Sequence, residues 1–221
     1  MSEERWTAVD QYITDALVPP DAVLDSVLKD SEKAGLPPIQ VAANQGKFLM
    51  LLARIQGARN ILELGTLGGY STLWLARALP HGGRLITLEA DAKHAQVALA
   101  GFARAGLDDV IELRLGPALE TLPQLASEGC GPFDFIFLDA DKDNYPGYFP
   151  WLIKLSRPGT VIVADNVVRN GDVIDPDSKD PRVIGVRRFY ELVAAEPRVH
   201  ATAIQTVGSK GYDGFAIMTV S

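Results

Sequence analysis

The sequence is poor in cysteine, in long apolar runs and in clusters of basic residues. Cys130 is the only cysteine among 221 residues, so the chain can form neither an internal disulfide nor a cysteine-built zinc site. No apolar stretch approaches the roughly 20 residues that cross a membrane. The first residues, MSEERWTAVDQYI, carry acids where a signal peptide carries basic residues. We therefore expect a cytoplasmic protein without a membrane segment, and we interpret Cys130 as a passive loop residue.

Acidic residues outnumber basic ones, 28 to 21, which gives a net charge of -7. Such a field repels nucleic acid and anionic membranes, and no run of Lys and Arg suggests a local basic groove. Nucleic acid is therefore an unexpected partner, and a small molecule is the expected one. With 47% hydrophobic residues the chain can bury one good core, so we predict a single domain over residues 1–221.

The first 57 residues have the apolar spacing of helices. Proline pairs and glycines mark where these helices end. The three predicted helices cover residues 6–18, 21–35 and 40–57. From residue 58 onward, short apolar strands alternate with helices, a pattern typical of a parallel sheet with right-handed crossovers. The predicted strands are 60–65, 83–90, 109–116, 133–140 and 160–166, and the predicted helices are 70–80, 92–106, 118–129, 144–159 and 187–197.

The C-terminus breaks this alternation. Two strands, 199–207 and 214–220, are joined by the turn GSKGYD, which predicts an antiparallel hairpin. The predicted fold is therefore α/β, a mostly parallel seven-stranded sheet with an antiparallel C-terminal hairpin, helices on both faces and extra N-terminal helices. In such sheets a ligand binds beyond the carboxyl ends of the strands.

Two of these strand ends suggest a nucleotide-like ligand. The first strand runs into the glycine-rich turn LELGTLGGYST, where Gly65, Gly68 and Gly69 allow the backbone to approach a ligand. The spacing is not the G-x-G-x-x-G of dinucleotide-binding proteins, and a tight strand–helix turn is the alternative reading. Glu89 ends the second strand and could bind both ribose hydroxyls, although a solvated surface Glu is the alternative. Together they favour an adenosine-containing ligand.

The two remaining strand ends carry Asp139 and the pair Asp165-Asn166. Burying a carboxylate is costly unless a cation or hydrogen bonds compensate, and oxygen ligands without sulfur or imidazole suit Mg²⁺, Mn²⁺ or Ca²⁺. An aspartate that caps the next helix is the alternative for either residue alone. Lys142 lies three residues after Asp139; a neighbouring cation would favour its neutral form and make it a general base. His81, His94 and His200 are interpreted as structural.

Three segments, ILELGTLGGYSTLWLA, EGCGPFDFIFLDADKDNYPGYF and GTVIVADNVVRNGDV, resemble the metal-dependent class I S-adenosylmethionine-dependent O-methyltransferases of the catechol and caffeoyl-CoA group. The resemblance covers the chain from about Pro38 onward and implies a Rossmann-like methyltransferase fold. It divides the domain into N-terminal helices over the site (1–57) and a core (58–221), and it implies a homodimer. Ala140-Asp141 match the caffeoyl-CoA branch and the bacterial relatives.

The resemblance also implies roles for individual residues. S-adenosyl-L-methionine would be bound by residues along the strand ends: Val41, Glu63, Gly65, Thr66, Gly69, Ser71, Glu89, Ala118 and Asp139. Mg²⁺ (or Mn²⁺ or Ca²⁺) would be held by Asp139, Asp165 and Asn166. Lys142 would take the acceptor proton and Asn170 would help to place the acceptor, a small catechol-like aromatic. Residues 169–185 would cover the acceptor site.

Three other functions stay open at this point. Bacterial relatives of this family can methylate a hydroxylated tRNA base, although the acidic charge disfavours RNA. A nicotinamide-dependent oxidoreductase could use a similar sheet, but the missing glycine fingerprint weighs against it. A module that binds a metal or nucleotide without catalysis is the third.

Overall fold

The computed structural model describes residues 2–221, and one seven-stranded sheet organises them. The strands are β1 (Asn60–Leu64), β2 (Arg84–Glu89), β3 (Ile111–Leu115), β4 (Phe133–Leu138), β5 (Ser156–Asp165), β6 (Val199–Gly208) and β7 (Gly211–Val220). They lie in the order β3-β2-β1-β4-β5-β7-β6. The first five are parallel, and β7 runs antiparallel to both β5 and β6. The predicted fold is confirmed.

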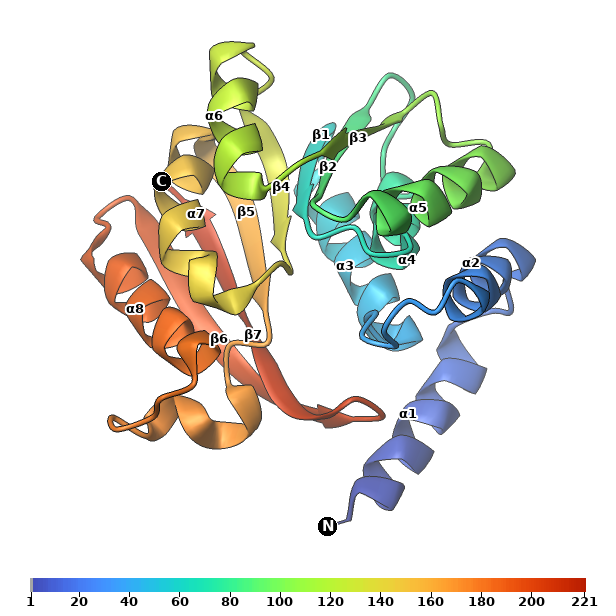
Figure 1. Ribbon diagram of the computed structural model, residues 1–221, viewed down its shortest axis with the longest axis horizontal. Coiled ribbons are helices and arrows are strands. Elements are labelled where there is room, and N and C mark those ends of the chain that lie inside the picture. Colours follow the sequence, from blue (N-terminus) through green and yellow to red (C-terminus); the bar gives the residue numbers. More distant parts are fainter. Residues whose placement is uncertain (1) are drawn as a thin grey trace.

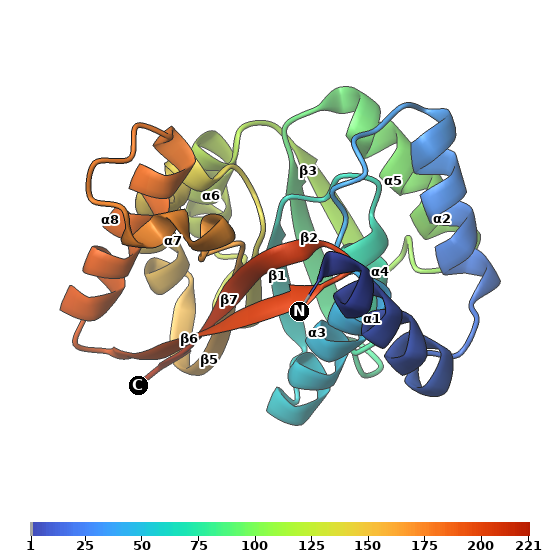
Figure 2. The ribbon, with the colours of Figure 1, turned by 90° about the horizontal axis from the view of Figure 1, so that it is seen from below.

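Helices cover both faces of this sheet (Figures 1 and 2). They are α1 (Glu3–Leu17), α2 (Ala22–Lys33), α3 (Ala43–Gln56), α4 (Tyr70–Ala76), α5 (Ala92–Ala105), α6 (Ala118–Ser127), α7 (Tyr145–Lys154) and α8 (Pro181–Ala195), with the short 3-10 helices η1 (Lys142–Asn144) and η2 (Arg169–Ile174). None of them is long and apolar enough to cross a membrane.

Successive side chains of the central strands enter opposite cores. Leu62 of β1 packs with α6, α7 and α8 on one face, and its neighbour Ile61 packs with α2 to α5 on the other. A strand that is buried on both faces needs an almost continuous apolar run, which is what β4 has in FDFIFL. Residues of α2 and α3 belong to this second core and pack against the same face of the sheet.

Several predicted boundaries differ from the structure. Residues 156–159 were expected to end a helix, but they belong to β5, which pairs Ser156 with Phe133. Helix α8 begins at Pro181, six residues before the predicted start, because Asp180 caps it by accepting from Arg182 N at 2.8 Å. The hairpin turn shrinks to Ser209-Lys210, since Gly208 already pairs with Gly211.

Candidate active site

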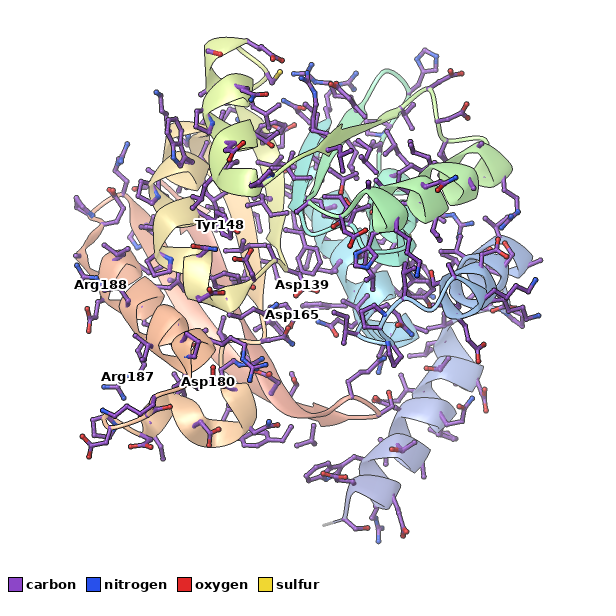
Figure 3. The ribbon with its side chains drawn as sticks, in the orientation of Figure 1. Asp139, Tyr148, Asp165, Asp180, Arg187 and Arg188 are labelled. Carbon is purple, nitrogen blue, oxygen red and sulfur yellow. The ribbon has the colours of Figure 1, made fainter. Side chains whose placement is uncertain are left out.

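The ends of four neighbouring strands bring the predicted site residues to one edge of the sheet. Glu89 ends β2, Gly65 follows β1, Asp139 follows β4 and Asp165 ends β5. These strands are adjacent in the order β2-β1-β4-β5. Asp139 and Asp165 consequently lie side by side near the middle of the molecule (Figure 3).

Gly65 lets two of these strand ends approach each other. Its φ of +96° is in the region that favours glycine. A Cβ atom at this position would collide with the backbone carbonyl of Asp139. Any larger residue would therefore push the Asp139 loop away from the β1 turn, and the spacing of the whole site depends on this glycine.

A cavity of about 490 Å³ opens beside this glycine, and we name it the Gly65 cavity. Most of the predicted cofactor contacts line it: Val41, Gly65, Thr66, Ser71, Glu89 and Asp139. Glu89 is held in place by backbone donors, since its Oε2 accepts from Leu67 N at 2.7 Å and its Oε1 from Asp91 N at 2.9 Å. The cavity therefore has a fixed carboxylate at one end and the Asp139 loop at the other.

The remaining predicted cofactor residues lie around this cavity. Ala118 lines an adjoining cavity of about 320 Å³, which we name the Ala118 cavity. Gly65 and Glu89 line it as well. Gly69 is the N-cap of α4 with φ of +87°, and a Cβ there would press into the ring of Phe102. Its place in the structure is a packing position beside the turn, away from the lining of the cavity.

Glu63 is a fully buried carboxylate beneath the glycine turn. Its Oε2 accepts hydrogen bonds from the hydroxyls of Thr72 and Thr87. Within the part of the chain that the structure describes, its Oε1 has no hydrogen-bond partner. Burial raises the pKa of Glu63 to about 7, against the hydrogen bonds that favour the ionised form. A cationic donor at this point would satisfy the unpaired oxygen.

Two carboxylates and an amide meet where β4 and β5 end. Asp165 is buried; its Oδ1 accepts from Asn166 N at 2.8 Å and its Oδ2 from Gln45 Nε2 at 2.7 Å. Burial, and then the nearby charge of Asp139, raise the pKa of Asp165 to about 7. Asn166 adopts φ of +55° directly after the strand. Two neighbouring carboxylates of this kind would be stabilised by a shared cation.

Lys142 lies on η1 and points back to the end of β4. Its Nζ donates to Asp139 Oδ1 at 2.6 Å, and it lies 5.5 Å from the ring centre of Tyr145. The single proton of the buried Tyr145 hydroxyl is shared between the carbonyl oxygens of Leu138 (3.0 Å) and Asp165 (2.9 Å). This tyrosine ties the two strand ends together and fixes the distance between the two aspartates.

A second cavity, of about 440 Å³, lies on the other side of these carboxylates, and we name it the hairpin cavity. It is bounded by α1, α3, the end of β5, η2 and the β6–β7 hairpin, and it includes the predicted residues Asp165, Asn166 and Asn170. Asn166 lines both cavities. The carboxylate pair therefore stands between two spaces that could each hold a ligand.

The structure adds several residues to those for which the sequence predicted a role in this site. Gln45 contacts Asp165 from 120 positions away, and Arg169 and Arg182 line the Gly65 cavity. Asp141 accepts from the hydroxyl of Tyr148 at the wall of the Ala118 cavity. His94, interpreted above as structural, also lines the Gly65 cavity, with Nδ1 3.5 Å from Glu89 Oε1. The contact of Gln45 with Asp165 joins distant parts of the chain, whereas Tyr148 is only seven positions from Asp141.

Comparison with known proteins identifies the family. The family model described as O-methyltransferase matches residues 16–215. The chain belongs to the O-methyltransferase family. It is 54% identical to the catechol O-methyltransferase of Niastella koreensis over 220 residues, which cover 100% of both chains. The predicted family and enzyme class, an S-adenosylmethionine-dependent O-methyltransferase, are confirmed.

Solved structures of this family superpose closely on the chain. The O-methyltransferase from Bacillus cereus, in complex with SAH, is 62% identical with a TM-score of 0.98, and the match covers 100% of both chains. The O-methyltransferase TomG from Streptomyces achromogenes, in complex with SAM and involved in tomaymycin synthesis, is 50% identical with a TM-score of 0.96 over 100% of this chain and 99% of that one. Neither an oxidoreductase nor a non-catalytic module is supported by these similarities.

Proposed function

We propose that this methyltransferase transfers the methyl group of S-adenosyl-L-methionine to a hydroxyl of a catechol-like aromatic acceptor, with a divalent cation at Asp139, Asp165 and Asn166. The observation that carries the proposal is the position of these oxygen ligands between the Gly65 cavity and the hairpin cavity, with Asn166 lining both. One cavity would hold the methyl donor and the other the acceptor. The name of the Niastella relative, catechol O-methyltransferase, supports the acceptor class.

We expect the cofactor in the Gly65 cavity, with the buried Glu63 beneath the adjoining glycine turn. The unpaired Oε1 of Glu63 is a ready acceptor for the ammonium of the methionine part. Glu89, held by Leu67 N and Asp91 N, would bind the ribose hydroxyls, and the Ala118 cavity would take the adenine. Val41, Thr66 and Ser71 complete the walls, with Gly65 giving the backbone its close approach.

The donor set fits a hard divalent cation. Among the described residues 2–221, no cluster of three or more His, Cys, Asp or Glu side chains is placed to hold a metal ion, and here two carboxylates are completed by an amide. Carboxylate and amide oxygens suit Mg²⁺, Mn²⁺ or Ca²⁺, and Mg²⁺ keeps several positions for water or substrate oxygens. The raised pKa of Asp165 follows from burial next to Asp139, a situation that a bound cation would relieve.

The chemistry required is deprotonation and alignment. A phenol has a pKa of about 10, so it is mostly protonated at neutral pH and is a poor nucleophile. A bound divalent cation would supply the electrostatic stabilisation that makes the acceptor hydroxyl more acidic. Lys142, whose Nζ donates to Asp139 Oδ1, would take the proton, and Asn170, which lines the hairpin cavity, would orient the acceptor. The two cavities would bring donor and acceptor together, and such positioning would supply much of the acceleration.

The proposal extends to the assembly. The chain would form one domain, with the N-terminal helices 1–57 over the site and the core in 58–221, and it would act as a homodimer. Support comes from β6, an edge strand of ten residues whose side chains are mostly exposed, and from α1, which has no buried residue. Val9, Tyr12 and Ile204 are exposed on these two elements. Sedimentation equilibrium should give twice the mass of the chain, and a monomer at micromolar concentration would contradict this assembly.

A pair of acceptors tests the proposed reaction. Catechol and phenol differ by one hydroxyl, so only catechol can present two adjacent oxygens. Initial rates with S-adenosylmethionine and Mg²⁺, followed by mass spectrometry, should show methylation of catechol and no measurable methylation of phenol. Equal rates for the two acceptors would contradict chelation of the acceptor, while the family assignment would stand.

A further inference from the structure

The tip of the β6–β7 hairpin closes the far end of the hairpin cavity. It reaches across the molecule to α1 and the segment before α3 (Figures 1 and 2). Ser209 N donates to Asp10 Oδ2 at 2.7 Å, and Asn44 Nδ2 donates to the other oxygen of Asp10 at 2.8 Å. Lys210 Nζ donates to the carbonyl oxygen of Pro38 at 3.0 Å. The tip is thereby fixed, and Lys210 with it, at the rim of the cavity.

The acidic side chains that line this cavity already have hydrogen-bond partners or a proposed role. Asp10 accepts two hydrogen bonds, as described above. Asp213 accepts from the backbone of Val168 and Arg169 at 2.9 Å each, and its Oδ2 lies 3.5 Å from Arg169 Nη1. Asp165 belongs to the proposed cation site. Each of these acids therefore has partners or an assigned role.

Lys210 is different. Its ammonium has three donors, of which one meets the Pro38 carbonyl. Among the described residues, no carboxylate oxygen lies within 4.0 Å of its Nζ. Burial lowers the pKa of Lys210, as expected for an ammonium that is partly desolvated without a compensating charge. An anion at the rim of the cavity would supply that charge.

The hairpin cavity, which Lys210 and Asp165 both line, has aromatic walls and more room than a catechol needs. The rings of Phe48 and Phe215 lie 5.2 Å apart between centres, and Tyr212 adds a third ring. A benzene-sized ligand fills a cavity of about 150 Å³. The hairpin cavity is about 440 Å³, so an acceptor that consists of one small ring would leave most of it to water.

From this arrangement we infer that the physiological acceptor carries a carboxylate on the side of the ring opposite its hydroxyls, and that Lys210 pairs with this carboxylate and determines specificity for acidic acceptors. The inference rests on the proposed function, which places the two hydroxyls at the Asp165 end. The aromatic walls would hold the ring and its linker. Acceptors in which a short apolar linker joins a dihydroxyphenyl ring to a carboxylate match this order of groups.

The test compares a charged acceptor with its neutral isostere. We would use 3-(3,4-dihydroxyphenyl)propenoate and the corresponding amide, with the wild-type enzyme, Lys210→Met and Lys210→Arg. The expected result is that Lys210→Met raises KM for the acid about tenfold, because it loses one charge-assisted hydrogen bond. The kcat for the acid and both constants for the amide should change less than about twofold, and Lys210→Arg should restore most of the affinity for the acid.

Two outcomes would overturn the inference. One is an equal change of KM for acid and amide in Lys210→Met, and the other is a wild-type enzyme that prefers the amide. If neither acceptor is methylated, the proposed function fails. Titration calorimetry of the acid against SAH-saturated protein then tests whether Lys210 binds the carboxylate. Binding of the acid that Lys210→Met weakens about tenfold supports the site, whereas unchanged or absent binding overturns it.

Discussion

The Nζ atom of Lys142 donates a 2.6 Å hydrogen bond to Oδ1 of Asp139, three residues earlier in the chain. Both side chains are largely buried, with exposed fractions of 11% and 19%. The lysine that we propose as the general base is therefore held on one of the carboxylates that we propose as cation ligands. Base and cation would act on the same acceptor hydroxyl, and the short helix η1 sets the distance between them.

Replacing Lys142 tests its role as the base. Lys142→Met keeps the aliphatic part of the side chain and removes the amine, so kcat should fall by about 10²–10⁴. The dissociation constant for SAH should change less than about threefold, because Lys142 is not among the proposed cofactor contacts. Lys33→Met, at a side chain that is 80% exposed, is the matched control and should retain normal turnover. A near-normal kcat in Lys142→Met would mean that another group takes the proton.

Asp165→Asn separates the stability of the metal-free protein from its response to metal. The substitution removes one of two buried neighbouring carboxylates, so the Tm of the protein in EDTA should rise by about 2–4 °C. Addition of Mg²⁺ should raise the Tm of the wild type and leave that of the variant unchanged. Asp172→Asn, at an exposed acid of the nearby loop, should respond like the wild type. An unchanged Mg²⁺ response in Asp165→Asn would contradict the cation site.

Glu63 should make cofactor binding depend on pH. Its pKa of about 7 in the free protein lies above the 4.5 that is ordinary for a glutamate, whereas a bound ammonium favours the ionised carboxylate. The affinity for SAH should therefore rise roughly 20-fold from about pH 5.5 to about pH 7.5, with release of a proton near the lower end. Calorimetry in buffers of different ionisation enthalpy measures both effects. Glu63→Gln should bind more weakly at neutral pH and lose this dependence; a parallel pH profile in the variant would assign it to another group.

The same shift affects the stability of the free protein. Because the folded-state pKa of Glu63 is raised, its contribution is most favourable below about pH 4.5 and is lost as the pH rises through about 7. The difference in free energy of unfolding between wild type and Glu63→Gln, measured in urea without cofactor, should therefore shift in favour of the variant between these two pH values. A difference that is constant with pH would contradict the raised pKa.

Gly185 should be sensitive to the smallest substitution. It lies in α8 against η1, and a Cβ there would collide with the backbone carbonyl of Lys142 and lie 2.7 Å from Asp143 Cα. Gly185→Ala should cost about 1–3 kcal/mol of stability and lower kcat by displacing Lys142. Gly147→Ala in α7 is the control, since its Cβ would meet only the side chain of Leu119 at 3.1 Å. A normal Tm and kcat in Gly185→Ala would mean that α8 does not fix the position of the base.

The sequence allowed prediction of those parts that depend on local patterns. The alternation of apolar strands and helices predicted the parallel part of the sheet, and the polar residues at the ends of β2, β4 and β5 indicated one edge of it as the site. The start of α8 was missed because its signal, Asp180-Pro181, precedes the apolar pattern rather than lying within it. Gln45 and Lys210 were missed because their positions depend on partners 120 and 172 residues away. No local pattern encodes such contacts.

The most direct test of the account is mass spectrometry of an acceptor after incubation with the purified protein and S-adenosylmethionine, with Mg²⁺ in one sample and EDTA in the other. With 3,4-dihydroxyphenyl acceptors we predict a gain of one methyl group in Mg²⁺, no gain in EDTA, and recovery when excess Mg²⁺ is added to the EDTA sample. Equal methylation in EDTA would contradict the role of Asp139, Asp165 and Asn166 as cation ligands. No methylation in either sample would contradict the acceptor class.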